Sequence, residues 1–524
     1  MARYKPYDYR QRKLVPVDFE SQILPGTFEY TLAYLIEHEF DLSSFDERYR
    51  NDERGAPAYD PAILLKVILY AYSRGITSSR EIARACEENV TFMALSADTR
   101  PHFTTIAAFI AGLGEDATGI FRDVLLVCDE AGLIGREMFA VDGVKLPSNA
   151  SKEWSGTRAD FERKARKMER AVEALVQKHR RADREKPRGR GRGDGDGGLR
   201  RREEETKQTL KKKLATIRGW LDTHEDRVGR RGKVVKSNLT DGDSAKMSSS
   251  HGVVQGYDAL AVVDSKHQVV VNAEAFGEAQ EHALLRPMLE GARAHLAAIG
   301  ERGDVLRKVS VSADSGFHCR ETVQWVYESG IDAYLADNRM RKRDPRYSES
   351  NRHDPGRPMW GTYTRGTAQR LYMPPDFHYD EQLERCICPA GKKMYVGYRG
   401  ERSGRKVIRF KGTKGACLPC AHRGRCLRYP ERTEIRQVAF FGERVKREVP
   451  SYVEQMKAKV DSELGRARYA MRLAIAEPPF ANIRSTLRLD RFSLRGKGKV
   501  NAQWLMYCIV HNIGKIHRHA PGYE

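Results

Sequence analysis

The sequence predicts an α/β protein in which a mixed sheet follows a helical N-terminal domain. Three observations predict this fold: helical apolar periodicity before residue 135, strand-like apolar runs from Met138 onward, and helical segments between the later strands. A long polar helical segment and a basic, cysteine-rich segment interrupt the pattern. We therefore expect a sheet domain that carries two insertions.

The N-terminal segment predicts a series of short helices. Asp60 is placed to cap a helix that begins at Pro61 and stops near Gly75. "TSSREIARACEEN" and "FTTIAAFIAGL" predict two more. Three short helices with small turns are typical of a helix-turn-helix arrangement, and a plain helical bundle gives the same pattern. We predict a helical DNA-binding domain over residues 1–134.

Strand-like runs begin with "MFAVDGVKL". "GYDALAVVD" and "HQVVVNAEAF" follow, and "VSVSADSG" and "IDAYLAD" come later, each after a helical segment. Consecutive strands followed by alternation of strand and helix predict a mixed sheet with an antiparallel part. Helix resumes near Ser462, and we assign the sheet domain to residues 135–337 and 451–524.

The first insertion, residues 152–226, predicts an antiparallel helical hairpin. Apolar residues recur at spacings of three and four on both sides of a glycine-rich stretch, namely Phe161, Ala165, Met168, Val172 and Leu175, then Leu210, Leu214, Ile217 and Leu221. "PRGRGRGDGDGG" (187–198) predicts a flexible basic tip, because glycines at this density do not propagate a helix. The outer faces of this hairpin are also consistent with a solvated charged arm.

The charge balance favours a polyanionic partner. There are 92 Lys and Arg against 71 Asp and Glu, a net charge of +21. The most apolar run, "PAILLKVILYAY", contains Lys66 and is too short to span a bilayer. We expect a soluble cytoplasmic protein, associated with DNA and not with membranes.

Three acidic residues stand out by position. Asp142 lies at the centre of an apolar strand, and Asp314 lies at the end of another, beside Ser315 and Gly316. A carboxylate in an apolar strand is costly unless it is paired or coordinated. Glu477, in "AIAEPPFANIR", would come from a late helix onto the sheet. Each acid taken alone is also consistent with a strand-end cap or a solvated helix end.

Together, three such acids fit phosphodiester chemistry. Cleavage and strand transfer need the attacking and leaving oxygens to be stabilised together, which two divalent ions about 3.5–4 Å apart can do. Magnesium prefers hard carboxylate oxygens, and Mn²⁺ accepts the same ligands. An acid on the first strand, one after the fourth and one on a later helix form an RNase H-like arrangement.

Several motifs resemble those of bacterial DDE-type insertion-sequence transposases, of the insertion-sequence 1182 group in the insertion-sequence 4 superfamily. They include "FDERYRNDERGAPAYDPAILLKVILYAYSRG", "FAVDGVKLPSNAS", "SNLTDGDSAKM", "ADSGF" and "FSLRGKGKVNAQWLMYCIVHNIGK". The resemblance covers roughly residues 15–515 and is weakest in the hairpin.

The resemblance implies that Asp142, Asp314 and Glu477 are the catalytic triad and the Mg²⁺ or Mn²⁺ ligands. The superfamily's Tyr-Arg-Glu-Lys signature corresponds here to Tyr469, Arg472, Glu477 and Arg484, with arginine in place of lysine. Four residues separate Arg472 from Glu477, where three are usual, which weakens any exact role for Arg472. By resemblance the tyrosine and the two arginines contact phosphates near the cleaved end.

Two prolines follow Glu477 directly. Proline in a helix interior removes a hydrogen bond and clashes with the preceding turn. We therefore expect Pro478 and Pro479 to bend or restart the helix just after Glu477 and so to set its direction.

The second insertion, residues 338–450, contains five clustered cysteines. A Cys-x2-Cys pair with one cysteine upstream and one downstream suits tetrahedral zinc coordination, with four thiolates closing a structural site. Resemblance around "CPAG" favours Cys388, Cys417, Cys420 and Cys426, with Cys386 as a substitute or spare. A set of reduced thiols without metal remains the alternative.

The stretch "RSTLRLDRFSLRGKGK" follows the Glu477 helix and predicts contacts with the DNA backbone. Its candidate residues, besides Arg484, are Arg488, Arg491, Arg495 and Lys497.

We expect a transposase that binds the inverted repeats of its own element, cleaves the ends and joins the 3′-hydroxyls to target DNA, as a homodimer in the synaptic complex. A hairpin intermediate on the element end rests on superfamily analogy. Two alternatives remain: an RNase H-like nuclease or resolvase that cuts without joining, and a non-catalytic DNA-binding protein.

Overall fold

The structure, a computed structural model, describes residues 17–48, 57–184, 194–229, 232–249, 252–344, 346, 371–402, 405–444, 451–520 and 522–523. The chain forms two compact units. The first comprises Met1–Leu335 and Glu463–Glu524, and the second comprises Ala336–Ser462. Each unit contains a sheet of its own.

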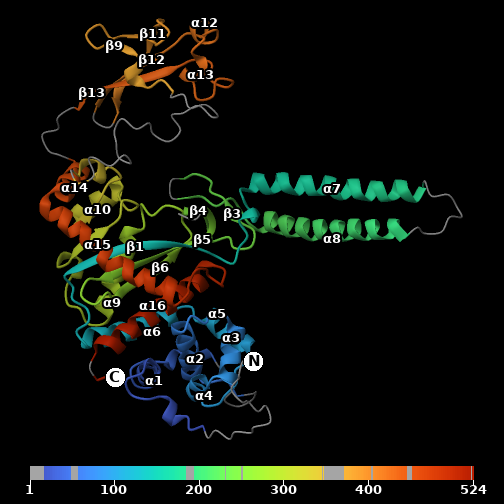
Figure 1. Ribbon diagram of the computed structural model, residues 1–524, viewed down its shortest axis with the longest axis vertical. Helices are drawn as coiled ribbons and strands as arrows, with labels where there is room; N and C mark the ends of the chain where they lie inside the picture. The colour runs from blue at the N-terminus through green and yellow to red at the C-terminus, as the bar shows by residue number, and fades with distance from the viewer. Residues whose placement is uncertain are drawn as a thin grey trace, which may run out of the picture. The chain divides into compact units, whose positions relative to one another are not determined.

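The N-terminal part of the first unit is helical, as the sequence predicts (Figure 1). Its α-helices are α1 (Phe28–His38), α2 (Pro61–Ser73), α3 (Ser79–Glu88), α4 (Val90–Leu95), α5 (Phe103–Gly112) and α6 (Asp116–Glu130). Asp60 caps α2 as expected, because its Oδ1 accepts a hydrogen bond of 2.7 Å from the Ala62 backbone N–H. Gly75 follows the helix with a φ of +71°, which glycine adopts readily.

The first unit is built on a six-stranded mixed sheet. Its strands are β1 (Met138–Pro147), β4 (Ala245–Ser249), β5 (Gly252–Asp264), β6 (Val270–Phe276), β7 (Ser310–Ala313) and β8 (Asp332–Leu335). The order is β4-β5-β1-β7-β8, and β6 also pairs with β5. β5 is antiparallel to its neighbours β1, β4 and β6, whereas β1, β7 and β8 run parallel. The expected mixed sheet with an antiparallel part is confirmed.

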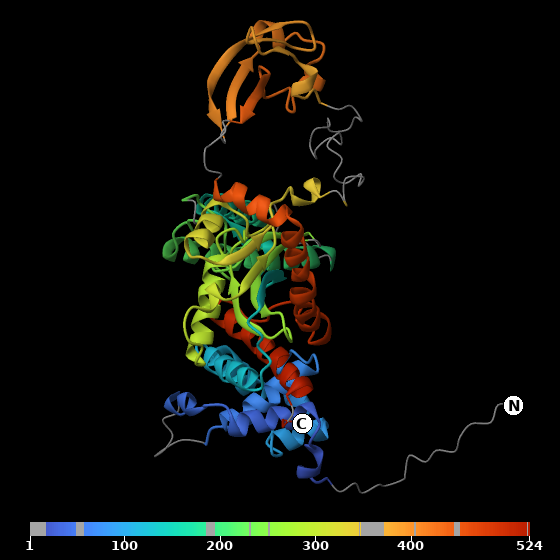
Figure 2. The same cartoon turned by 90° about the vertical axis from the view of Figure 1, so that its left-hand side faces the viewer.

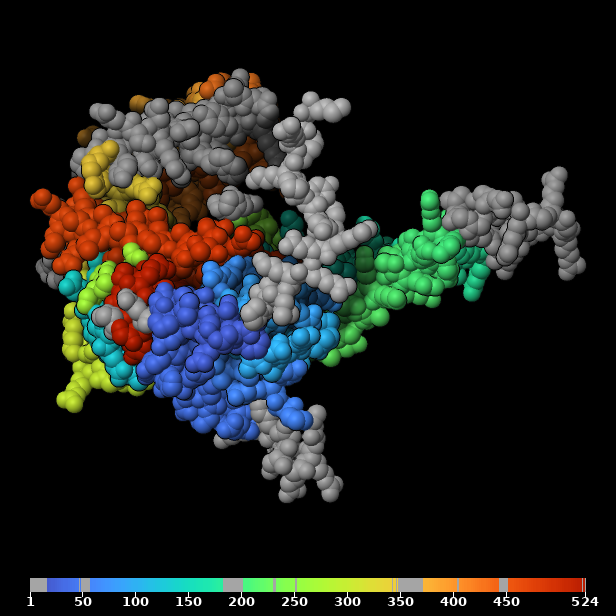
Figure 3. Space-filling model, turned by 60° about the horizontal axis from the view of Figure 1, so that its bottom comes forward, coloured from blue at the N-terminus to red at the C-terminus, as the bar shows by residue number. Residues whose placement is uncertain are grey.

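Helices pack on this sheet (Figures 1 and 2). They are α9 (Leu285–Ala298), α10 (Arg320–Glu328), α15 (Glu463–Ala481) and α16 (Lys497–His519). Asn512 of α16 bonds both the backbone N–H and the carbonyl of Val270, each at 2.9 Å. α16 also packs against α1, α2, α5 and α6. In Figure 3 the red C-terminal part of the chain lies against the blue N-terminal part. Tyr507 of α16 stacks on Tyr72 of α2 with ring centroids 4.6 Å apart. This helix therefore joins the N-terminal helices to the sheet.

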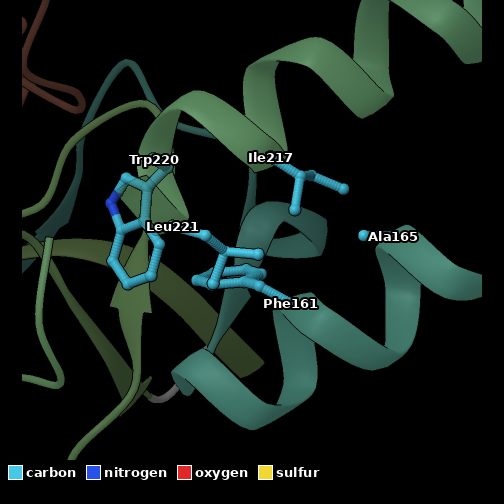
Figure 4. Packing of buried hydrophobic residues seen from close by; sticks show 5 residues of the cluster. All are labelled: Phe161, Ala165, Ile217, Trp220 and Leu221. Carbon is cyan, nitrogen blue, oxygen red and sulfur yellow. The ribbon is translucent and has the colours of Figure 1, made fainter. Parts of the chain in front are cut away.

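The inserted hairpin consists of α7 (Arg158–Arg184) and α8 (Asp194–Thr223), which begin and end beside the short pair β2 (Ser155–Gly156) and β3 (Ser237–Asn238). A small core lies at its base, where Phe161 meets Trp220 edge to face (Figure 4). The other buried members of that core are Ala165, Ile217 and Leu221.

The prediction of a flexible tip over residues 187–198 is wrong for the second half of that stretch. α8 begins at Asp194, so residues 194–198 are helical, and residues 187–193 lie outside the described residues. Acidic residues at the start of a helix are favoured by its dipole, and strong helix formers follow these glycines. Helix formation by the residues that follow outweighs the low propensity of glycine here.

The second unit contains a five-stranded antiparallel sheet in the order β13-β12-β11-β10-β9. Its strands are β9 (His378–Asp380), β10 (Arg385–Ile387), β11 (Lys393–Arg402), β12 (Arg405–Lys411) and β13 (Gln437–Arg444). The unit also contains α11 (Met340–Arg343), α12 (Lys414–Cys417), α13 (Arg423–Cys426) and α14 (Tyr452–Asp461). Helix thus resumes before Ser462, because Ser451 and Glu454 form a capping box for α14. The sheet has a small core, consisting of Phe377, Cys386, Met394, Phe410 and Val438.

Candidate active site

Asp142, in the middle of β1, and Asp314, directly after the last residue of β7, lie close together. β1 and β7 are parallel, and their last paired residues are Val141 and Ala313. In each chain segment the aspartate is the next residue, so the two carboxyl groups enter the same edge of the sheet. The negative charge of Asp314 contributes to the raised pKa of Asp142.

Glu477 reaches the same region from α15, which packs on β1 and β7. It lines one surface hollow together with Asp142, Gly143, Val144, Arg484 and Asp490. We refer to this as the acid hollow. The structure therefore places Asp142 next to Asp314 and places Asp142 and Glu477 on one hollow.

Arg472 occupies the centre of this arrangement. Its Nη1 donates to Asp142 Oδ2 in an ion pair, and the Gly143 backbone N–H donates to Asp142 Oδ1 at 2.8 Å. The Arg472 guanidinium also lies 5.8 Å from the centroid of the Tyr469 ring. Arg472 is thus bound to a candidate catalytic acid, a contact that sequence reasoning did not foresee.

Burial dominates the electrostatics of both aspartates. Burial raises the pKa of Asp142 above its ordinary value, although the Arg472 guanidinium opposes this shift. Burial and then the charge of Glu281 raise the pKa of Asp314, while the Gly316 backbone N–H, 2.7 Å from Oδ1, opposes them. A cation near these carboxyl groups would therefore stabilise the ionised form of both aspartates.

Two further acids lie beside this pair and were missed by the sequence reasoning. Lys145 Nζ binds Glu281 Oε1 at 2.7 Å, and Lys145 pairs across the sheet with Asp258 of β5. Asp258 is completely buried. Burial, and next to it the charge of Glu281, raise its pKa to about 8. Asp258 carries the signal that singled out Asp142, an acid inside the apolar run "GYDALAVVD", whereas "EAQEHALL" around Glu281 has no such signal.

Carboxylate oxygens are the ligands that Mg²⁺ and Mn²⁺ prefer. In the part of the chain that the structure describes, no three His, Cys, Asp or Glu side chains are arranged closely enough to hold a metal ion. Arg472 and Lys145 instead neutralise Asp142 and Glu281. The donor set fits a hard divalent cation, which would compete with these two basic side chains.

The helix that carries Glu477 is not interrupted by its prolines. α15 runs through Pro478 and Pro479 to Ala481 and is followed by a π-helical turn, Asn482–Thr486, that contains Arg484. The expectation that the prolines restart the helix just after Glu477 is therefore wrong. The departure from regular α-helix is instead the π-helical turn, which begins at Asn482, directly after the end of α15.

A tertiary hydrogen bond explains why the helix continues. Pro478 has no N–H, so the carbonyl of Ala474, four residues earlier, loses its helical partner. Gln268 Nε2 donates to that carbonyl at 3.1 Å instead. Lys515 Nζ in turn donates to Gln268 Oε1 at 3.0 Å, and His511 Nε2 lies 3.0 Å from the Gln268 carbonyl. α16 thus supports the loop that stabilises α15.

Of the predicted DNA-contacting residues, Tyr469 and Arg472 are half-buried, and the five that follow Glu477 are exposed but do not form one group. Arg484 lines the acid hollow. Arg488 lies against Gly75, where a Cβ would come within 2.8 Å of its Cδ. Arg495 Nε donates to the Asn149 carbonyl at 2.6 Å, and Arg491 donates to the Asn149 side chain at 3.4 Å.

Lys497 lies at the start of α16. Its Nζ binds Glu274 Oε1 at 2.8 Å, and with Arg495 it lines a separate hollow beside Asp241 and Trp220. Of the five predicted basic residues that follow Glu477, the structure therefore brings only Arg484 to the acid hollow, whereas Arg472 binds Asp142.

In the second unit, four cysteines meet around one cavity, which we refer to as the cysteine cavity. It is lined by Cys388, Cys417, Cys420 and Cys426. The fifth, Cys386, is buried in the small core, with its Sγ 3.9 Å from Met394 Sδ. Burial raises the pKa of Cys426 to about 11, with Arg436 opposing and the three other cavity cysteines adding to the shift.

No described helix is both long enough and apolar enough to cross a membrane. Residues 387–517 match the family model of a transposase DDE domain, and residues 17–112 match that of a transposase domain (DUF772). The first match includes Glu477 and the cavity cysteines but neither Asp142 nor Asp314. No curated protein matches the chain. The two family matches support an insertion-sequence transposase, and the family implies a DNA partner and divalent metal ions.

Proposed function

We propose that this protein cleaves the ends of its own insertion sequence and joins the 3′-hydroxyls to target DNA. The observation that carries the proposal is that Asp142 and Glu477 line one hollow and that Asp314 lies beside Asp142. The matches to two transposase domains support the same reaction class. Membership of the insertion-sequence 1182 group and a hairpin intermediate on the element end belong to this proposal as its finer parts.

Asp142, Asp314 and Glu477 would hold two Mg²⁺ or Mn²⁺ ions. When bound, these ions would activate the attacking water or hydroxyl and stabilise the leaving oxygen. The aspartates are half-buried, Asp142 within β1 and Asp314 directly after β7, so their carboxyl groups are held in position before DNA arrives. Burial also strengthens their attraction for a cation.

Arg472, Tyr469 and Arg484 would contact phosphates near the cut. Arg484 is exposed on the hollow, and its planar guanidinium can bind a phosphate in a bidentate manner. Arg472 would exchange Asp142 for a phosphate oxygen when a cation neutralises that carboxylate. The net charge of +21 supplies a general attraction for the DNA backbone.

The helical N-terminal region would bind the inverted repeats. Arg488, Arg491, Arg495 and Lys497 are exposed and would contact the backbone of the bound DNA. A synaptic complex that holds two element ends would contain two copies of the chain.

Labelled DNA carrying the inverted repeats that flank the reading frame tests the function. With Mg²⁺ and a target plasmid, we expect cleavage at the element ends and joining of the labelled 3′ ends to the plasmid. Cleavage without joining would support a nuclease or resolvase. Sequence-specific binding with neither reaction would support a non-catalytic DNA-binding protein.

We also propose that the four cavity cysteines hold a structural zinc ion. All four line one cavity, as their spacing suggests, and Cys386 is excluded from it. The sheet around them has a small apolar core, and small domains often need a metal or disulfide for stability. Four thiolates would leave no open position, so the ion would have no part in the reaction.

A further inference from the structure

A second acidic pair lies immediately beside Asp314. A Cβ placed on Gly316 would lie 2.2 Å from Glu281 Oε2 and 2.8 Å from Asp314 Oδ1. Only a residue without a side chain allows both carboxylate oxygens to approach the same backbone atom. Glu281 therefore lies next to Asp314 although the two are far apart in sequence.

Asp258 lies behind this contact, close enough to Glu281 for the two carboxyl groups to share a proton. It has an exposed fraction of 0%, and within the described residues its carboxylate oxygens accept no hydrogen bond from a permanent N–H or O–H donor. Its Oδ1 is 3.2 Å from the position that a Cβ on Gly143 would take, directly after Asp142. A buried carboxyl group without a partner is costly, which points to a cation or a shared proton near it.

Glu281 also opens to solvent on the side of the acid hollow. Glu281 and Lys145 line a neighbouring hollow whose other walls include Gly143, Val144, Arg484 and Asp490. These four residues line the acid hollow as well. The two hollows therefore adjoin each other, so a cation at Glu281 would lie on the same side of the sheet as one at Asp142.

We propose that Glu281 is a further ligand for a divalent cation of the Mg²⁺ or Mn²⁺ type, shared with Asp314, and that the buried carboxyl group of Asp258 lies behind this pair. This inference rests on the proposed function and adds a residue to its metal site. Lys145 neutralises Glu281 in the structure and would compete with the cation for that carboxylate. Carboxylate oxygens without softer donors select hard cations.

Mn²⁺ binding to the full-length protein without DNA tests the proposal. Electron paramagnetic resonance of free Mn²⁺ gives the affinity for wild type and for Glu281→Gln. We expect Glu281→Gln, and likewise Asp314→Asn, to weaken binding about tenfold or more. Glu290→Gln is the matched control, because Glu290 is partly exposed and pairs with Arg286 on α9. Unchanged Mn²⁺ affinity in Glu281→Gln would overturn the proposal.

The variant Lys145→Met distinguishes two roles of Glu281, as a ligand of the cation or only as the ion-pair partner of Lys145. If Glu281 binds the cation, removing its competitor should raise Mn²⁺ affinity by a factor of about 3 or more. If Glu281 serves only to hold Lys145, this variant should weaken binding as much as Glu281→Gln does. Glu281→Asp, which keeps a carboxylate, should retain most of the affinity. Circular dichroism confirms that each variant is folded.

The outcomes also separate this inference from the proposed function. Glu281-dependent Mn²⁺ binding in a protein that never cleaves element ends would keep the cation site and reject the transposase. End cleavage by wild type, with Mn²⁺ affinity unchanged in Glu281→Gln, would keep the transposase and reject this role of Glu281.

Discussion

The acid hollow and the cysteine cavity are assembled in opposite ways. The acids at positions 142, 314 and 477 lie far apart in the chain and meet because strands β1 and β7 and helix α15 pack together. The cavity cysteines all fall between Cys388 and Cys426, on short turns beside one antiparallel sheet. A site of the first kind depends on the whole unit, whereas a site of the second kind depends on a few local segments.

The two regions also differ in how their charge is balanced. Basic side chains bind the acids, Arg472 to Asp142 and Lys145 to Glu281. In the cysteine cavity, burial favours the neutral thiol of Cys426, with only partial opposition from Arg436. A metal must therefore displace cations from the acid hollow but protons from the cysteine cavity.

The largest expected effect is the loss of chemistry on changing an acid-hollow residue. Asp142→Asn should reduce end cleavage by at least about a thousandfold, roughly 4 kcal/mol of transition-state stabilisation, because it removes a metal ligand. Gel assays with labelled element ends measure cleavage, and mobility shifts measure DNA binding, which should persist. Glu290→Gln is the control and should cleave at the wild-type rate. Cleavage at the wild-type rate in Asp142→Asn would contradict the assignment of Asp142 to the catalytic triad.

Next in size is the expected effect of changing a cysteine in the cavity. Structural zinc contributes on the order of 10 kcal/mol in zinc-finger peptides, so Cys420→Ser should remove bound zinc and unfold much of the second unit. Elemental analysis measures zinc, and limited proteolysis measures folding of residues 371–444.

Cys386→Ser provides the matched control. Its side chain lies in the core and outside the cavity, so zinc content should remain at the wild-type level. Wild-type protein without zinc, or equal zinc loss in both variants, would contradict the difference between the cavity thiols and Cys386.

We expect the free energy of unfolding to depend on pH through His511, which lies on α16 beside the Gln268 loop that stabilises α15. Burial lowers the pKa of His511 to about 4, with the hydrogen bond to the Gln268 carbonyl opposing and Lys515 and Arg518 adding to the shift. The unfolded state takes up a proton near pH 6.5 and the folded state only near pH 4. Stability from this group is therefore complete above pH 6.5 and falls as pH decreases, by at most ~3 kcal/mol.

Urea unfolding at pH 7.0, 5.5 and 4.5 tests this effect. His511→Gln should show a shallower fall in the free energy of unfolding than wild type does. Parallel curves for the two proteins would show that His511 is not held neutral by burial.

The smallest effect is expected at the loop that supports the proline-containing helix. Gln268→Asn keeps a residue that tolerates the φ of +60° found there but cannot reach the Ala474 carbonyl. We expect a loss of about 1–2 kcal/mol in the free energy of unfolding. We also expect end cleavage to decrease, but by less than in Asp142→Asn. Gln324→Asn, on the exposed face of α10, should change stability by less than about 0.5 kcal/mol. Equal effects of the two substitutions would remove the explanation for the uninterrupted helix.

Sequence patterns predicted the fold where short-range forces decide it. The cap at Asp60, the alternation of helices and strands after β6 and the mixed character of the sheet follow from local hydrogen bonding and apolar periodicity. The short strand β4 was not predicted, so Asp314 follows the fifth strand of this sheet in chain order and not the fourth, as we had expected. The glycine-rich start of α8 was mispredicted, because single-residue propensity was given more weight than the strong helix formers that follow. The five-stranded sheet of the second unit was not foreseen in its basic, glycine-rich sequence.

For the site, the positions of the acids and the family resemblance predicted Asp142, Asp314 and Glu477, of which Asp142 and Glu477 line one hollow. The cysteine spacing and the same resemblance predicted the four cysteines that line one cavity. The catalytic and metal-binding roles of these residues stay predictions. The ion pair of Arg472 with Asp142 and the bond from Gln268 to Ala474 join residues 330 and 206 positions apart. Such contacts arise only when strands and helices pack, so no local pattern encodes them. Tertiary structure alone decided how Glu477 is carried through two prolines and which acids lie beside Asp314.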